Sequence, residues 1–296
     1  MKKYKPYLNR VDLVKNQVER EKLAEQEASN KRKRSIQQQN KQRWLRYQEQ
    51  LRSELAARYF HSVQSVGGES FTNTKSILLD GVNDYVDTST YFGVPPIDRY
   101  NKDTFSVSVW IKVDASQTVN WQYYTPISAT TNGSNVGLVT RKFGNATGHV
   151  VYSNPNNGTT QLDDGNWHHL LGVFIASTNN WRVFVDGNST PEINQTIASW
   201  QFFDKNVKIG QQGNQTNYFV GNVDECAYWL SDESTNLATI YNNGVPNNLT
   251  SLSPISWWRC GDGDTSPTLT DNGSGGNDGT MTNMDSGDIV EDVPGS

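Results

Sequence analysis

The sequence has few cysteines and no long hydrophobic run. Its 296 residues include only two cysteines, Cys226 and Cys260, too few for a disulfide framework or a cysteine-rich metal site. We therefore expect two buried free thiols. No apolar stretch approaches the roughly 20 residues that cross a membrane, and no apolar segment of the secretory type follows the basic residues 1–10. These absences argue against a disulfide-stapled mini-protein and a membrane protein, and they predict synthesis and folding in a cytoplasm.

Glycine is also absent from a large part of the chain. Residues 1–66 contain none, whereas residues 67–296 contain all 24. The first part carries 16 Lys/Arg and 7 Asp/Glu, a net charge of +9, and the second carries 10 and 24, a net charge of −14. A basic arm (residues 1–66) therefore precedes an acidic body (residues 67–296), which indicates an attachment segment joined to a displayed domain.

The arm has the composition of a long α-helix. Residues 11–59 contain neither proline nor glycine, and helix-forming residues dominate. An apolar stripe follows the spacing i, i+3, i+7, i+11 and consists of Trp44, Tyr47, Leu51 and Leu55. A dense basic cluster precedes it and consists of Lys31, Arg32, Lys33 and Arg34. Because such a narrow stripe stabilises an isolated helix poorly, we expect a partner to hold the arm.

Three kinds of partner fit the arm. Further copies of the chain would form a coiled coil, which residues 44–55 favour and residues 29–40 do not. Nucleic acid would bind the basic cluster, although a solvated charged face explains these residues equally well. A larger acidic protein surface accounts for the whole arm with the fewest assumptions, and we predict that kind of docking.

The body shows the alternation of β-strands. Apolar and polar residues alternate from Phe105 to Val113. Further strands are predicted at residues 76–80, 85–88, 136–142, 149–152, 168–175, 181–186, 205–210, 222–230 and 255–260. Asp-Gly and Asn-Gly turn signals separate many of them, and a short helix is predicted at residues 234–241. The pattern predicts an all-β body, a two-sheet antiparallel jelly-roll sandwich, after an extended helical arm.

Several segments of the body resemble the laminin G-like, concanavalin A-like lectin/glucanase superfamily. In family order they include Leu79–Val86 (LDGVNDYV), Phe105–Ile111 (FSVSVWI), Asp164–His169 (DGNWHH), Val183–Gly187 (VFVDG) and Gly221–Glu225 (GNVDE). The resemblance covers roughly residues 70–250 and implies two stacked antiparallel sheets.

One segment departs from the family order. A Trp-containing strand with an Asp/Gly/Asn-rich continuation usually comes first, but its counterpart here, residues 257–280, follows the body. We therefore predict that residues 255–260 pair beside residues 222–230, that Cys260 comes close to Cys226, and that residues 255–296 complete the sandwich. Exchange of this strand with a neighbouring subunit is the alternative.

Catalysis is not expected, although glucanases share this fold. Glycoside cleavage needs two carboxylates about 5–9 Å apart, and glucanases of this superfamily present them as Glu-x-Asp-x-x-Glu on one strand. The chain contains no such run. Asp224 and Glu225 are adjacent, so we expect their side chains to point to opposite faces of a strand. We predict a protein that is not an enzyme.

Two groups of residues are candidates for binding. Asp262, Asp264 and Asp271 are candidate calcium ligands, because laminin G-like modules often hold calcium at the sandwich rim; ordinary Asx turns are the alternative, since Pro267 replaces the glycine of an EF-hand loop. Trp121, Tyr123 and Tyr124 lie in a polar stretch expected between strands. Their rings can stack on sugar rings or cap the edge of the sandwich.

The arm and the lectin-like body together resemble structural proteins of tailed bacteriophages. This resemblance implies a virion protein of the head- or tail-fibre or capsid-decoration type, assembled in the host cytoplasm. Its arm would dock on capsid or tail proteins, and its body, in a homo-oligomer, would adhere to cell-surface glycans weakly and multivalently. A purely architectural capsid or tail protein, and a bacterial adhesin or secreted lectin, are the alternatives.

Overall fold

The computed structural model divides the chain into two compact units, Met1–Glu69 and Ser70–Ser296. The residues that it describes are 17, 19–23, 26, 71–88, 90, 103–113, 123–131, 134–142, 148–153, 156–197, 207–212 and 217–296. In the first unit, residues 19–23 are helical with exposed side chains, and Gln17 Nε2 donates to Glu21 Oε1 across 3.3 Å. The rest of the predicted helix, including its basic cluster and apolar stripe, lies outside the described residues.

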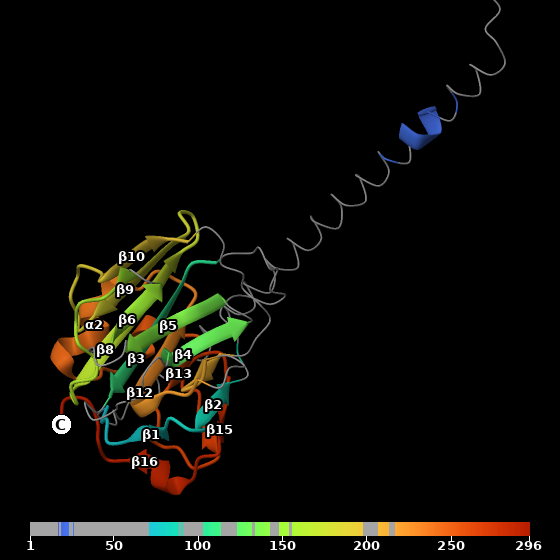
Figure 1. Ribbon diagram of the computed structural model, residues 1–296. Helices are drawn as coiled ribbons and strands as arrows, with labels where there is room; N and C mark the ends of the chain where they lie inside the picture. The colour runs from blue at the N-terminus through green and yellow to red at the C-terminus, as the bar shows by residue number, and fades with distance from the viewer. Residues whose placement is uncertain are drawn as a thin grey trace, which may run out of the picture. The chain divides into compact units, whose positions relative to one another are not determined.

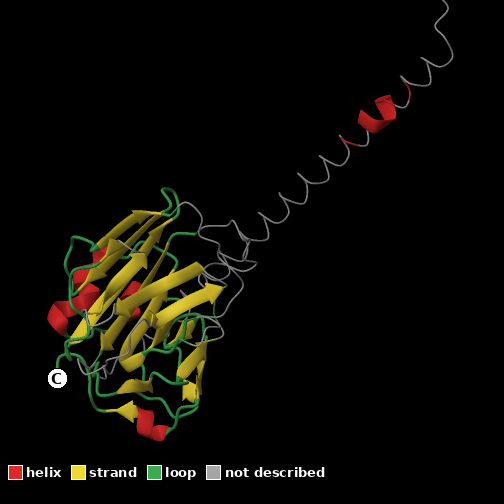
Figure 2. Ribbon diagram, in the orientation of Figure 1, coloured by secondary structure: helices red, strands yellow, loops and turns green. Residues whose placement is uncertain are grey.

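The second unit is a sandwich of two antiparallel sheets (Figures 1 and 2). The first sheet has the strand order β10-β9-β8-β3-β12-β1-β16, and β13 also pairs with β12. Its strands are β1 (Ser76–Asp80), β3 (Phe105–Lys112), β8 (Trp167–Ile175), β9 (Asn180–Val185), β10 (Ile193–Thr196), β12 (Val220–Trp229), β13 (Ser256–Trp258) and β16 (Ile289–Val290). Every strand predicted for this sheet is confirmed, with small differences at the ends.

The second sheet has the order β14-β15-β2-β11-β4-β5-β6-β7. Its strands are β2 (Tyr85–Thr88), β4 (Tyr123–Thr131), β5 (Ser134–Lys142), β6 (Gly148–Ser153), β7 (Asn156–Asn157), β11 (Lys208–Ile209), β14 (Thr268–Leu269) and β15 (Gly279–Thr282). The helical turns are η1 (Ser234–Asn236), α2 (Leu237–Tyr241), η2 (Asn242–Gly244), η3 (Thr250–Leu252) and η4 (Ser286–Asp288). The helix predicted at residues 234–241 is thus confirmed as η1 and α2.

The main core lies between the sheets. On β3, the alternating Phe105, Val107, Val109 and Ile111 are each 1% exposed or less and face this core. A second cluster covers the other side of the first sheet, where Leu237 and Ile240 of α2 pack with apolar residues of β8, β9, β12 and β13. Because both faces of the first sheet are covered, all but the last residue of β3 are buried.

The C-terminal residues complete both sheets. Cys226 of β12 lies opposite Trp258 of β13, β16 pairs with β1 and β15 pairs with β2. The predicted pairing of residues 255–260 beside β12 is therefore confirmed, and it forms within one chain. Cys226 Sγ and Cys260 Sγ lie 3.8 Å apart, and both thiols are buried and free, as predicted.

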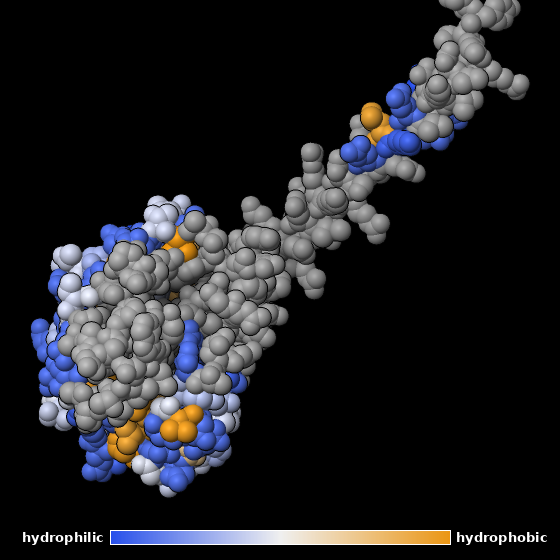
Figure 3. Space-filling model, in the orientation of Figure 1, coloured by the Kyte–Doolittle hydropathy of each residue, from blue (hydrophilic) through white to orange (hydrophobic). Residues whose placement is uncertain are grey.

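The surface of the second unit is mostly polar. Figure 3 shows hydrophilic residues over most of the visible described surface, with small hydrophobic areas between them. Among the described residues of this unit, the exposed large apolar ones are Leu78, Val82 and Val245, and single exposed residues of this kind are ordinary. No helix within the described ranges is long and apolar enough to span a membrane.

Candidate functional site

A β-bulge in β12 brings two carboxylates to one face of the first sheet. The pairing of β12 with β3 shifts register between Asp224 and Ala227, and Glu225 has φ of 46°. Val223 and Cys226 both face the main core, so Asp224 and Glu225 between them share the outer face. The expectation that their side chains point to opposite faces is wrong, because the bulge interrupts the alternation of the strand.

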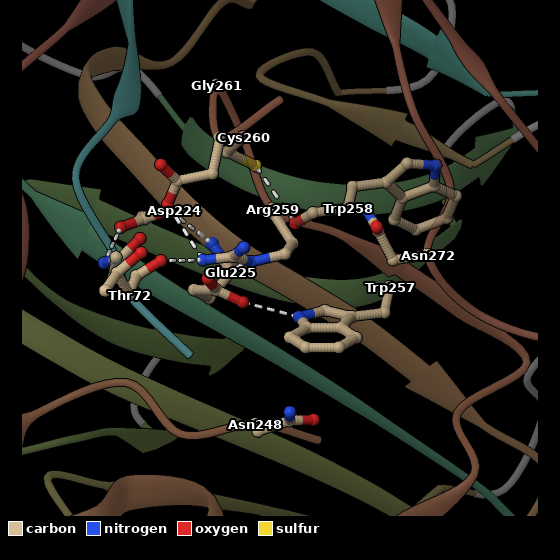
Figure 4. Close-up of polar contacts among 12 residues, drawn as sticks. Thr72, Asp224, Glu225, Asn248, Trp257, Trp258, Arg259, Cys260, Gly261 and Asn272 are labelled. Atoms are coloured by element: carbon tan, nitrogen blue, oxygen red, sulfur yellow. Dashed lines mark hydrogen bonds and ion pairs between the residues drawn. The ribbon is translucent and has the colours of Figure 1, made fainter. Parts of the chain in front are cut away.

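Arg259 connects Glu225 to Asp262 of the C-terminal segment (Figure 4). Its Nε donates to Glu225 Oε1 across 3.1 Å, and its Nη2 donates to Asp262 Oδ2 across 2.9 Å. The Nε1 of Trp257 donates to the other oxygen of Glu225. We call Asp224, Glu225, Arg259 and Asp262 the acid–arginine cluster.

Burial dominates the electrostatics of this cluster. Asp224 is 0% exposed and Glu225 is 2% exposed. Burial raises the pKa of Asp224 well above its usual value, and the negative charge of Glu225 raises it further. Burial also raises the pKa of Glu225, to about 7, although Arg259 opposes this shift. The cluster therefore retains at least one carboxyl proton at mildly acidic pH.

Two histidines of β8 lie on opposite sides of the strand. His168 Nδ1 lies 2.7 Å from Asp186 Oδ2, and its Nε2 lies 3.1 Å from Asp164 Oδ1. Burial lowers the pKa of His168, but these two carboxylates outweigh it and raise the pKa above its usual value. His169 Nε2 contacts Ser108 Oγ across 2.8 Å, and burial lowers the pKa of its ring to about 4. The Ser108–His169 pair is sealed from solvent, with 1% and 0% of the residues exposed.

The three candidate calcium ligands accept hydrogen bonds from the protein itself. Asp264 accepts from the backbone N–H groups of Gly261 and Thr270, and Asp271 accepts from three further backbone N–H groups. Asp262 accepts from Arg259 and from Thr74. Within the described ranges, no group of three or more His, Cys, Asp or Glu side chains is placed to hold a metal ion. Asp271 forms an Asx turn with Gly273 N–H, whereas Asp262 and Asp264 accept from other parts of the chain.

Polar and aromatic side chains line the outer face of the second sheet. Val86, Ile209 and Met281 face the core, so their strand neighbours Tyr85, Asp87, Lys208, Thr280 and Thr282 face away from it. Asp87 lies opposite both Lys208 and Thr280 in neighbouring strands, which sets these three residues in one row across the sheet.

Two tyrosines form the aromatic part of this face. The rings of Tyr85 and Tyr218 have centroids 6.3 Å apart. Lys208 Nζ lies 4.2 Å from the centroid of the Tyr85 ring and 3.5 Å from Asp87 Oδ2. Tyr85 and Tyr218 are partly exposed. We call Tyr85, Asp87, Lys208, Tyr218, Thr280 and Thr282 the tyrosine–lysine face.

Two of the three aromatic residues singled out from the sequence belong to the same sheet. Tyr123 and Tyr124 lie in β4, not in a segment between strands as expected, and β4 pairs with β11. Trp121 lies outside the described residues. The sequence search missed Tyr85 and Tyr218. The alternation of Tyr85 and Asp87 with the apolar Val86 was the available signal, because it places both polar residues on one face.

Comparisons with known proteins identify the fold family. A family model described as the concanavalin A-like lectin/glucanases superfamily matches residues 80–231, which is more than half of the 296-residue chain. No curated protein matches the chain. Solved structures match it at low sequence identity, which carries information on the fold alone.

Three of these solved structures illustrate the range of similarity to this chain. A candidate carbohydrate-binding protein from Bacteroides ovatus has a TM-score of 0.52 at 17% identity, over 76% of this chain and 62% of that chain. A heptameric SAP-like pentraxin from Limulus polyphemus has a TM-score of 0.38 at 10% identity, over 58% and 84% of the two chains. Domain 4 of an extracellular arabinanase from Geobacillus stearothermophilus, solved with arabinotriose, has a TM-score of 0.34 at 18% identity, over 46% and 66%.

The chain spans 62% of the length of the Bacteroides ovatus protein, so the likeness concerns the sandwich and not that whole protein. The family model and the two-sheet architecture agree on the same residues. The chain belongs to the concanavalin A-like lectin/glucanases superfamily.

Proposed function

We propose that residues 71–296 form a carbohydrate-binding domain and that the ligand lies on the tyrosine–lysine face. The observation that carries this proposal is the pair of neighbouring, partly exposed tyrosine rings on the outer face of the second sheet. Sugar rings present C–H groups that pack on aromatic faces, while their hydroxyls need hydrogen-bonding groups close by. Thr280, Thr282 and Asp87 supply such groups beside the rings.

The charges on this face favour a neutral, hydroxyl-rich ligand. Lys208 is the cation of the tyrosine–lysine face and lies 3.5 Å from the carboxylate of Asp87, so the pair has no net charge. Membership of the lectin/glucanase superfamily and the description of the Bacteroides ovatus protein as a candidate carbohydrate-binding protein support the same ligand class.

We propose that binding is not followed by hydrolysis. A glycosidase needs two carboxyl groups that flank the scissile bond in a cleft. Asp224 and Glu225 are adjacent carboxylates on one face, but they are 0% and 2% exposed and are enclosed by Asn73, Trp257 and Arg259. A sugar cannot reach them in this conformation.

We further propose that the chain is a structural or appendage protein of a bacteriophage virion. The division into an arm of net charge +9 and a body of net charge −14 supports attachment by residues 1–66 to capsid or tail proteins and outward display of the domain. Several displayed copies would raise a weak glycan affinity by avidity. An architectural role without glycan binding, or a bacterial adhesin or secreted lectin, are the alternatives.

Glycan-array binding of the full chain, followed by calorimetry with the best ligand, tests the proposed site. Removing one ring with Tyr85→Ala or Tyr218→Ala is expected to weaken binding by about 0.5–1.5 kcal/mol, or roughly twofold to tenfold. Val82→Ala, which shortens an exposed loop side chain, serves as the control and should bind as the native chain does. If no glycan binds, or if both tyrosine variants bind normally, the tyrosine–lysine face is not the site.

A further inference from the structure

We infer that residues 71–75, which we call the strap, are a pH-sensitive latch. The strap lies over the acid–arginine cluster at mildly acidic pH and loosens as the pH rises above neutrality. This inference does not depend on the proposed carbohydrate binding. It rests on four consecutive contacts between the strap and the cluster and on an imbalance of charge beneath them.

The strap contacts the cluster residue by residue. The ring of Phe71 stacks on Trp257 with centroids 6.1 Å apart, and the guanidinium of Arg259 lies 4.5 Å from the Phe71 centroid. The carbonyl oxygen of Thr72 accepts from Arg259 Nη2 across 2.6 Å. These contacts hold the first half of the strap against β13.

The second half of the strap contacts the carboxylates. Asn73 Nδ2 donates to Asp224 Oδ2 across 2.7 Å. Thr74 donates to Asp262 twice, from its backbone N–H across 3.0 Å and from its hydroxyl across 2.6 Å. Since Asp224 is 0% exposed and Asn73 contacts one of its oxygens, opening of the strap would admit water to this carboxylate.

The cluster holds three carboxyl groups and one cation. Arg259 balances one negative charge. If Asp224, Glu225 and Asp262 are all ionised, the cluster therefore carries two excess negative charges. Neighbouring cations do not correct this imbalance: Lys75 at the end of the strap pairs with Glu291 across 2.8 Å, and Lys112 of β3 pairs with Asp292 across 2.6 Å. Among the described residues, the Cys260 thiol is a further titratable neighbour, and burial raises its pKa.

The closed strap therefore favours protonated carboxyl groups. In the open state water would stabilise the ionised Asp224, so its pKa would move back toward the ordinary value and each ionisation would favour opening. Asn73 and Thr74 donate to Asp224 and Asp262, which by itself favours the ionised carboxylates. At Asp224, however, burial and the charge of Glu225 outweigh the Asn73 hydrogen bond, so the pKa in the closed state stays raised.

Hydrogen exchange of the full chain, read as protection factors between pH 6 and pH 9, tests the latch. The protection factors of the amides of residues 72–75 are expected to fall about tenfold across this range. A difference of about one unit between the pKa of Asp224 in the closed state and in the open state gives this factor. Core amides of β8 should lose less than about twofold. Equal loss in the strap and in β8, or no loss in the strap, would overturn the inference.

Matched variants show whether the cluster causes the effect. Asp224→Asn removes one excess charge and keeps the side-chain shape, so the strap should stay protected at pH 9. Glu225→Gln removes a charge at the next position. It is tested in parallel so that the latch can still be tested if the Asp224→Asn variant does not fold. Glu291→Gln removes an exposed charge beside Lys75 and should keep the native pH dependence. A native pH dependence in the two cluster variants would contradict the latch.

Discussion

Gly172 of β8 allows a tryptophan to fill the core above it. A Cβ atom at this position would lie 2.4 Å from Trp181 Cη2 and 2.7 Å from Trp181 Cζ2. Trp181 is 2% exposed and belongs to the main core, so its indole has no free space into which it can move. Glycine normally weakens a strand interior, and here the close approach of the indole explains its presence.

Gly172→Ala should therefore destabilise the domain by overpacking, by about 1–3 kcal/mol in the free energy of unfolding. Trp181→Phe removes the two atoms that the new methyl group would meet. In that background the cost of Gly172→Ala should fall markedly, which a double-mutant cycle of urea-unfolding free energies measures. Strictly additive costs would show that the indole is not the obstacle.

The directions of side chains were predictable where strands are regular. Alternation alone places Tyr85 and Asp87 on one side of Val86, as observed. Alternation gives the wrong directions at Asp224 and Glu225, because the β-bulge there follows from tertiary pairing. The positive φ of Glu225 could not be predicted either, since no glycine at this position indicates it. The acid–arginine cluster depends on that bulge, so the sequence did not reveal it.

At the scale of elements, the strands with strong alternation were predictable and the short or polar ones were not. β1 and β2 were predicted with their observed ends. β4 was missed because its sequence, YYTPISATT, is polar and contains Pro126. β14 and β16 have two residues each, too few for any periodicity, and they form because neighbouring strands offer an unpaired edge.

β13 has three residues, but it is expected to stabilise the sandwich strongly. Its Trp258 is 0% exposed, belongs to the main core, and donates from Nε1 to the carbonyl oxygen of Asn277 across 2.8 Å. Trp258→Ala should lower the free energy of unfolding by about 3–5 kcal/mol. Trp258→Phe keeps much of the buried area and should cost clearly less. Similar small losses for both variants in thermal and urea unfolding would mean that β13 is peripheral.

At the scale of the whole molecule, the chain consists of two units with different composition. The described residues of the second unit form a two-layer core to which both ends of its sequence contribute: β1 pairs with β12 near one end, and β13, β15 and β16 pair near the other. Residues 1–66 of the first unit, rich in charge and free of glycine, have the composition of a segment that is stabilised by its partners.

This division predicts that binding and assembly can be separated by cutting the chain after residue 70. The fragment 71–296 should fold, with a cooperative unfolding transition close to that of the full chain, and should bind a soluble monovalent glycan with the same affinity. On a glycan-coated surface the full chain should bind more tightly, by about 10²-fold, if the first unit gathers several copies. Analytical ultracentrifugation and surface binding of both proteins provide the comparison. An unfolded fragment would show that the core of the second unit is not complete without the first unit. Equal surface binding by both proteins would show that residues 1–66 do not provide multivalent display, which would contradict that part of the proposed function.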